Sequence, residues 1–175
     1  MNAEHIAALI DGLRGLPYDG EAVDQRTHAL QAAGHAIAAG GDDELVVAAA
    51  LHDIGRAAPV RAAYPGLPHE EAGAAFAREQ LGERVAWIIA AHVPAKRYLV
   101  ATDPAYRAQL SPTSIRTLAQ QGGDFTPEQA REFATHPWAA DATALRRWDD
   151  AAKDPAAPGA DLSVVLEAYE RLTGR

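Results

Sequence analysis

An adjacent histidine and aspartate, His52 and Asp53, follow directly after an apolar run over residues 46–51. The run contains only alanine, valine and leucine, so we expect the pair at a buried point of the fold. Burying a polar group without a partner costs about 2 to 7 kcal/mol, and a lone charge costs more. A bound divalent or trivalent metal ion is the simplest compensation for this cost, although good hydrogen bonds could also provide it.

Four other residues have a type and position that suit a metal ligand. His92 ends an apolar segment as His52 does, and His69 stands at the start of an expected helix. His28 lies on the helix that precedes His52 in the chain, and Asp149 lies near the end of a late helix. Ligand sets of imidazole and carboxylate suit iron, manganese and zinc, and open coordination positions favour iron or manganese.

Each of these residues also has an ordinary structural interpretation. A lone histidine in a helix is commonly a surface residue or a hydrogen-bonded core residue. Asp149 could form an exposed ion pair with Arg146 or Lys153, which would contribute about 0 to 1 kcal/mol. The remaining histidines have no informative context and are interpreted as surface residues: His5, His35 and His136.

Composition and charge exclude several classes of function. The absence of cysteine removes disulfides, thiolate metal sites and cysteine nucleophiles. A formal net charge of −8 argues against nonspecific nucleic-acid binding. No apolar stretch approaches about 18 residues and the first residues lack a signal-peptide pattern, so we expect a cytoplasmic protein without a membrane partner. The sequence leaves the oligomeric state open.

The elements that must position these residues are predicted to be helices. Apolar residues recur at helical spacing, alanine is abundant, and β-branched and aromatic residues are sparse. Thr126-Pro127 and Ser111-Pro112 have the cap-then-proline form of helix starts. Helices are expected over residues 3–14, 22–39, 43–53, 69–80, 82–93, 103–109, 112–121, 127–135, 137–150 and 161–173. We therefore predict an all-α fold, with residues 1–175 forming a single domain.

The order His, His-Asp, His, His, Asp on successive helices resembles the HD-domain superfamily of metal-dependent phosphohydrolases, which are all-helical. The resemblance implies one HD-domain helical bundle that holds two metal ions bridged by Asp53. By the same resemblance, one ion is held by His28, His52 and Asp149, and the other by His69 and His92.

Longer motifs resemble the oxygenase branch of this superfamily, which degrades organophosphonates and is related in chemistry to inositol oxygenase. They are Tyr18-Asp19-Gly20-Glu21, His92-Val93-Pro94-Ala95-Lys96-Arg97-Tyr98-Leu99, Gln121-Gly122-Gly123 and Arg146-Arg147-Trp148-Asp149-Asp150. The chain resembles in particular the 2-amino-1-hydroxyethylphosphonate dioxygenases. This resemblance implies a mixed-valence Fe(II)/Fe(III) pair as cofactor. It also implies O2 and a small-molecule hydroxyphosphonate as partners, with the substrate chelating iron before its C–P bond breaks.

The same resemblance assigns substrate contacts. Lys96, Ser114 and Arg146 stand where the family binds phosphonate, which requires cationic and hydroxyl donors. Tyr18 would occupy iron until substrate arrives, and Glu21 would then pair with a substrate ammonium. Alternatively, Tyr18 is an ordinary half-buried aromatic residue and Glu21 is a charge at a helix N-terminus.

One position departs from the family pattern. Arg56 stands where the resembled enzymes have a histidine that contacts phosphonate. Its guanidinium could hold the phosphonate with two hydrogen bonds or reshape the pocket for another hydroxyphosphonate. Arg56 could also point into solvent and pair with a surface acid.

The function expected from these residues is that of a diiron oxygenase that converts a 1-hydroxyalkylphosphonate, above all 2-amino-1-hydroxyethylphosphonate, to glycine and phosphate. Two alternatives stay open. A phosphohydrolase acting on nucleotides or phosphomonoesters would use the same ligands without O2. A signalling or scaffold domain would keep the fold and the metal without turnover.

Overall fold

A computed structural model describes residues 2–18 and 20–174 of the chain. Within these residues the regular structure is helical, apart from one isolated bridge between Pro17 and Asp24. The first elements are α1 (Ala3–Asp11), α2 (Gln25–Ala38), α3 (Asp43–Leu51), the 3-10 turn η1 (Ile54–Arg56), α4 (Ala58–Ala63) and α5 (His69–Leu81). The all-α prediction is confirmed, while the prediction of a single domain over residues 1–175 stays a prediction.

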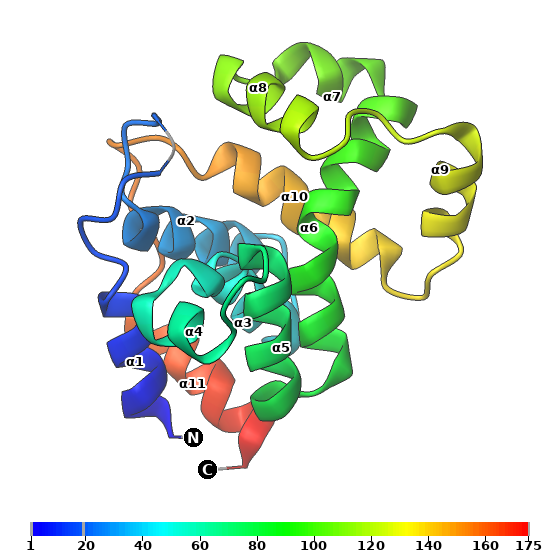
Figure 1. The fold of residues 1–175 in the computed structure, drawn as a ribbon. Coiled ribbons are helices and arrows are strands. Elements are labelled where there is room, and N and C mark those ends of the chain that lie inside the picture. The colour runs from blue at the N-terminus through cyan, green and yellow to red at the C-terminus, as the bar shows by residue number, and fades with distance from the viewer. Residues whose placement is uncertain (1, 19, 175) are drawn as a thin grey trace.

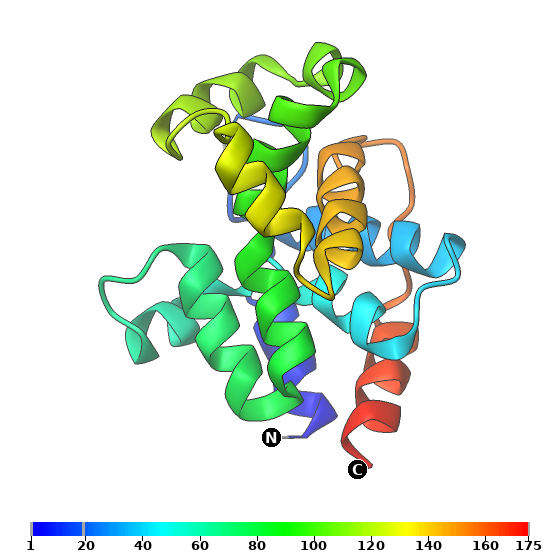
Figure 2. The same cartoon turned by 90° about the vertical axis from the view of Figure 1, so that its right-hand side faces the viewer.

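The second part of the chain continues with α6 (Glu83–Thr102), α7 (Pro104–Gln109), α8 (Pro112–Gln120), α9 (Pro127–Ala134), α10 (Ala139–Ala151) and α11 (Leu162–Thr173). Figure 1 shows α6 running through the molecule, with α7, α8 and α9 gathered around its C-terminal half. The N-terminal half of α6 packs against α5. Both ends of the described chain lie on the same side, as Figure 2 also shows.

The centre of the core is α3. Every residue from Leu45 to Leu51 on it is buried, because α2, α6, α10 and α11 all pack against it. Alanines contribute much of the surface in contact, and their small side chains let the helices approach closely. The apolar run before the His-Asp pair is therefore a fully buried helix, as the sequence suggested, and it delivers that pair to the interior.

One predicted helix boundary is wrong by several residues, and two short elements were not predicted. The helix expected to end at residue 93 continues through Pro94 to Thr102 as α6. Proline removes one backbone donor, but the neighbouring Val93, Ala95 and Leu99 are all buried, and this packing keeps the helix intact. The short elements η1 and α4 were also not expected, since six or fewer residues carry little periodic signal.

The predicted helix starts at the cap-then-proline motifs are confirmed. Thr126 and Gln129 form a reciprocal capping box, and the Ser111 hydroxyl accepts the backbone N–H of Ser114. These caps fix the beginnings of α9 and α8, the elements that surround the outer end of α6.

Among the described residues, no helix is long and apolar enough to pass through a membrane.

Candidate metal centre and adjoining pocket

The structure brings the six predicted metal ligands together from five segments. His28 lies on α2, His52 ends α3, and Asp53 directly precedes η1. The others come from later helices: His69 from α5, His92 from α6 and Asp149 from α10. All are buried except His69, which is partly exposed. Residues separated by more than 100 positions in the sequence thus lie close together in the interior of the protein.

Donor atoms of these residues form two groups that share Asp53. His28, His52 and Asp53 make up one group, and Asp53, His69 and His92 make up the other, with the donor atoms of each group within 4.8 Å of one another. Asp149 adjoins the first group, since its Oδ1 lies 3.3 Å from Nε2 of His28 and 3.9 Å from Nε2 of His52. Asp53 is therefore the carboxylate that both groups of donor atoms have in common.

Hydrogen bonds orient the imidazole rings. The Nδ1 atoms of His28, His52 and His92 donate to the backbone carbonyls of Ala152 (2.8 Å), Ala49 (2.8 Å) and Ile89 (2.7 Å). A carbonyl oxygen can only accept, so Nδ1 carries the proton and Nε2 presents a lone pair to the centre. His69 is held similarly, with Nδ1 3.0 Å from the Glu70 carboxylate. Such outer partners are characteristic of metal-binding histidines.

The electrostatics of the centre also suit a cation. Burial, reinforced by the neighbouring rings of His52 and His69, lowers the pKa of His92 to about 3, so this ring is neutral at ordinary pH. Burial alone would raise the pKa of Asp53, but the charges of Arg56 and His69 outweigh it and hold that pKa well below its usual range. Neutral imidazoles and ionised carboxylates are the protonation states that ligate metals.

Backbone packing places Asp53 beside His69. A Cβ added at Gly55 would lie 1.9 Å from the His69 carbonyl oxygen, a distance that excludes any side chain. Glycine at this position lets η1 approach the start of α5 closely. This contact accounts for the glycine two residues after Asp53, and it brings Nε2 of His69 to 2.9 Å from Oδ1 of Asp53.

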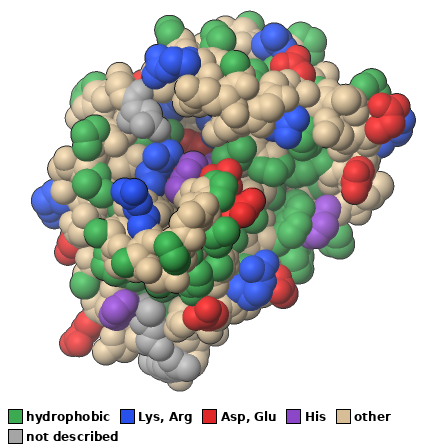
Figure 3. Space-filling view, viewed as in Figure 1, with side chains coloured by type: hydrophobic (Ala, Val, Ile, Leu, Met, Phe, Trp, Pro, Cys, Tyr) green, Lys and Arg blue, Asp and Glu red, His purple; other side chains and the backbone are tan. Residues whose placement is uncertain are grey.

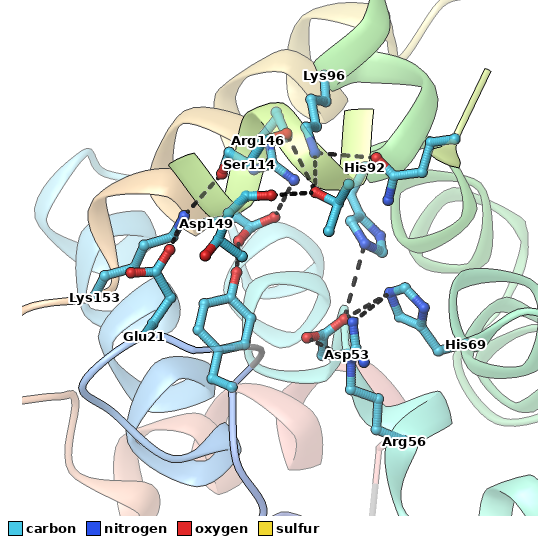
Figure 4. A pocket seen from close by; sticks show the side chains of 14 residues that line it. Glu21, Asp53, Arg56, His69, His92, Lys96, Ser114, Arg146, Asp149 and Lys153 are labelled. Carbon is cyan, nitrogen blue, oxygen red and sulfur yellow. Dashed lines mark hydrogen bonds and ion pairs between the residues drawn. The ribbon is translucent and has the colours of Figure 1, made fainter. Parts of the chain in front are cut away.

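A pocket opens onto this centre and gathers the predicted substrate contacts (Figure 4). Of the twelve predicted site residues, all but His28 and His52 line it. The Lys96 ammonium donates to Thr117 (2.6 Å) and Gln121 (3.1 Å), and burial together with the charge of Arg146 lowers the pKa of Lys96 to about 8. Ser114 and Arg146 are also buried in the pocket wall. The three residues supply two cations and a hydroxyl to one end of the cavity.

Tyr18 and Glu21 enter the pocket from the segment that precedes α2. The Tyr18 ring is half-buried and stacks on His28 with 3.9 Å between centroids, and its hydroxyl donates to Oδ1 of Asp149 over 2.8 Å. The carboxylate of Glu21 accepts from the Ser111 hydroxyl at 2.9 Å. The alternative that Glu21 is a helix N-terminal charge is wrong, because α2 begins at Gln25 and Asp24 caps it.

Two further alternatives from the sequence are also wrong. Asp149 does pair with Arg146, at 2.6 Å, but this ion pair is buried and belongs to the centre. Arg56 does not simply point into solvent, because its Nε donates to Oδ2 of the buried Asp53 at 3.0 Å and its Nη2 lies 3.4 Å from Nε2 of His69. The replacement of histidine by arginine therefore acts directly on the proposed bridging carboxylate.

A second cavity lies on the other side of Arg56 and His69, which line both spaces. Leu16, Gln25 and Arg61 also contribute to its wall. In Figure 3, basic side chains and a histidine adjoin one another on the face of the molecule shown there.

Several residues that shape the pocket were not predicted from the sequence. Asp150 accepts hydrogen bonds from Arg146 through both carboxylate oxygens, and the Tyr106 hydroxyl donates to it over 2.5 Å. Lys153, one helical turn after Asp149, also lines the pocket. Asp150 is part of the quoted Arg-Arg-Trp-Asp-Asp motif, and the spacing of Lys153 from Asp149 was a usable signal. His136, expected at the surface, is partly exposed and stacks on Trp87 with 3.6 Å between centroids.

Comparison with known proteins agrees with this arrangement. Residues 26–119 match the model of the HD domain, which spans His28, the His-Asp pair, His69 and His92. The chain belongs to the HD-domain family. It is 36% identical over 155 residues to [1-hydroxy-2-(trimethylamino)ethyl]phosphonate dioxygenase (glycine-betaine-forming) of Leisingera caerulea, covering 86% of this chain and 79% of that protein.

A second relative is the hydroxymethylphosphonate dioxygenase of Gimesia maris, 36% identical over 158 residues, with 86% of this chain and 79% of that protein covered. Both relatives are phosphonate dioxygenases by name and this chain contains an HD domain, so the resemblance to the oxygenase branch is confirmed. The two names differ in the phosphonate that they specify.

Proposed function

We propose that this HD-domain protein is a diiron oxygenase that cleaves the C–P bond of a 1-hydroxyalkylphosphonate with O2. The observation that supports this most strongly is that one cavity contains both the candidate metal ligands and a set of buried cations. Two groups of ligands share Asp53 at its base, and the buried cations Lys96 and Arg146 line its wall. An anionic substrate held by these cations would lie directly beside the metal centre.

The ligand residues fit a pair of iron ions. The Nε2 atoms of His28 and His52 are 3.0 Å apart, a spacing that two ligands of one ion have when each bond is about 2.1 Å long and the bonds are nearly perpendicular. His28, His52 and Asp149 would hold one ion, His69 and His92 would hold the other, and Asp53 would bridge them. When bound, an Fe(II)/Fe(III) pair would supply activation of O2 and coordination of the substrate hydroxyl and phosphonate oxygens.

The chain's own residues would bind and orient the phosphonate. Arg146 is held rigidly by Asp149 and Asp150, so its guanidinium loses little freedom when an anion binds. Lys96 and Ser114 would add an ammonium and a hydroxyl from neighbouring helices. Arg56 already donates to Asp53, which supports a role in holding that carboxylate and in shaping the pocket.

Tyr18 and Glu21 would act at the parts of the site away from the phosphonate, Tyr18 at the metal centre and Glu21 at the substrate ammonium. The Tyr18 hydroxyl lies among the ligand atoms through its bond to Asp149, which supports occupation of the centre until substrate displaces it. Glu21 offers a carboxylate to a substrate ammonium. These two positions favour 2-amino-1-hydroxyethylphosphonate as substrate, giving glycine and phosphate.

The choice of substrate is tested by product analysis. Iron-loaded protein is incubated with 2-amino-1-hydroxyethylphosphonate, hydroxymethylphosphonate or the trimethylamino compound, and phosphorus NMR follows the conversion of phosphonate to phosphate. We expect the amino compound to give the highest kcat/KM. Cleavage of nucleotides or phosphomonoesters without O2, and of no phosphonate, would instead establish a phosphohydrolase.

A further inference from the structure

Lys153 has a position in the pocket that the phosphonate-binding set does not explain. It follows α10, and its side chain is only 14% exposed. Its ammonium lies 3.5 Å from Oε1 of Glu21, 3.2 Å from the Ser114 hydroxyl and 3.3 Å from Oδ1 of Asp150. It also lies 5.7 Å from the centre of the Tyr18 ring. One cation thus touches both the proposed ammonium site and the proposed phosphonate site (Figure 4).

The partners of Lys153 differ in what else they bind. Asp150 is committed to Arg146 and Tyr106 whether or not Lys153 is present. Glu21, with a side chain 18% exposed, has Lys153 as its charged partner and Ser111 as its neutral one. A substrate ammonium that binds Glu21 must therefore compete with Lys153 for the same carboxylate.

A zwitterionic substrate would offer both members of this pair a new partner. Its ammonium would replace Lys153 at Glu21, and its phosphonate would lie beside Ser114, within reach of the released lysine. Because both charges remain paired, neither is left desolvated and unsatisfied in the pocket. A substrate with an uncharged substituent would leave the Glu21–Lys153 pair intact.

We propose that Lys153 is a specificity-determining residue that exchanges Glu21 for the substrate phosphonate when a primary aminophosphonate binds. A primary ammonium can take over the hydrogen bonds of Lys153 to Glu21. A trimethylammonium group has no N–H donor, so it competes poorly with the lysine. The inference rests on the proposed function and extends it, because it makes Lys153 select a primary amine over an uncharged or quaternary substituent.

A double-mutant cycle tests the exchange. The four proteins are the wild type, Glu21→Gln, Lys153→Met and the double variant, each loaded with iron. Dissociation constants for hydroxymethylphosphonate and 2-amino-1-hydroxyethylphosphonate are measured by calorimetry without O2, and kcat and KM are then measured with O2. Circular dichroism and melting temperature verify folding, and Lys153→Gln with Glu21→Ala forms a second cycle if one variant is unstable.

The exchange predicts that removing the Glu21 charge increases the affinity for one of the two substrates. Glu21→Gln frees Lys153, so it should tighten binding of hydroxymethylphosphonate by about threefold or more, near the lower end of couplings between side chains in contact. It should weaken binding of the amino substrate. The gain for hydroxymethylphosphonate should vanish in the Lys153→Met background.

Equal effects of Glu21→Gln with and without Lys153 would overturn the exchange, as would unchanged or weaker binding of hydroxymethylphosphonate. Failure of the proposed function would appear differently, as wild-type protein that binds these phosphonates and cleaves none of them. The binding cycle reports on Lys153 in either case.

Discussion

The Nε2 atoms of His28 and His52 face each other at 3.0 Å in the buried interior, while the Nδ1 atom of each ring donates to a backbone carbonyl. Two lone pairs at this distance repel one another unless a proton or a metal ion lies between or beside them. Asp149 raises the pKa of His28 against the effect of burial, whereas burial lowers the pKa of His52. The pair is therefore built to share a cation.

Removal of metal should destabilise the protein. Chelation leaves buried carboxylates and facing imidazoles without their ion, whereas a ligand present at 100 times its Kd stabilises the native state by about 2.7 kcal/mol. We expect the melting temperature to rise with added Fe(II) under anaerobic conditions and to fall after treatment with a chelator. A melting temperature that does not respond to either treatment would count against a metal centre here.

Replacement of the shared carboxylate should empty the centre. Asp53→Ala removes the residue common to both ligand groups, so we expect iron content measured by atomic emission to fall close to zero. Asp124→Ala is the control, because Asp124 is exposed and pairs with Arg107 away from the centre. Normal iron content in Asp53→Ala would refute the bridging role.

Loss of the Glu21 carboxylate should change substrate preference. Glu21→Ala removes the proposed partner of the substrate ammonium, so KM for 2-amino-1-hydroxyethylphosphonate should rise, whereas KM for hydroxymethylphosphonate should not. Steady-state kinetics with both substrates measure, for each substrate, the ratio of KM in the variant to KM in the wild type. If both KM values change equally, the assignment of Glu21 to the ammonium does not hold.

Asp150 should act by positioning the guanidinium of Arg146. Asp150→Asn weakens a partly buried, hydrogen-bonded charge pair, and breaking fully buried pairs of this kind in binding sites costs about 2 to 5 kcal/mol. We expect KM to rise at least about tenfold for every phosphonate, with a smaller change in kcat and unchanged iron content. Phosphonate affinity equal to that of the wild type would show that Arg146 does not depend on Asp150.

The affinity for phosphonate should fall in alkaline solution. Lys96 has a pKa lowered to about 8 by burial, so its protonated fraction, and the charge that attracts the substrate, declines as the pH rises through that value. We expect kcat/KM to decrease above about pH 8. Lys96→Arg should lack this decrease, since arginine stays protonated. The same decrease of kcat/KM in the variant would show that a group other than Lys96 titrates.

The helical class was predicted from local signals, and the six candidate ligands were predicted from local signals together with the resemblance to the HD-domain superfamily. Helical periodicity identified most helices, and a histidine at the end of an apolar segment marked His52 and His92. Side-chain partners were harder to predict. The bond from Arg56 to Asp53 lies within the short turn η1, which the sequence did not predict. The contact of Lys153 with Glu21 depends on tertiary packing that brings the segment before α2 beside the residues that follow α10. The continuation of α6 through Pro94 was not predicted for the same reason, since it depends on the buried packing of Val93, Ala95 and Leu99.

Oxygen consumption measured together with phosphate release tests the central claim most directly. Protein reconstituted with Fe(II) is given racemic 2-amino-1-hydroxyethylphosphonate in an oxygen electrode, and phosphate is measured in the same sample. The conversion to glycine and phosphate adds both atoms of O2, so we predict one O2 consumed for each phosphate released. Phosphate released without uptake of O2, or no reaction with any hydroxyphosphonate, would contradict the oxygenase assignment.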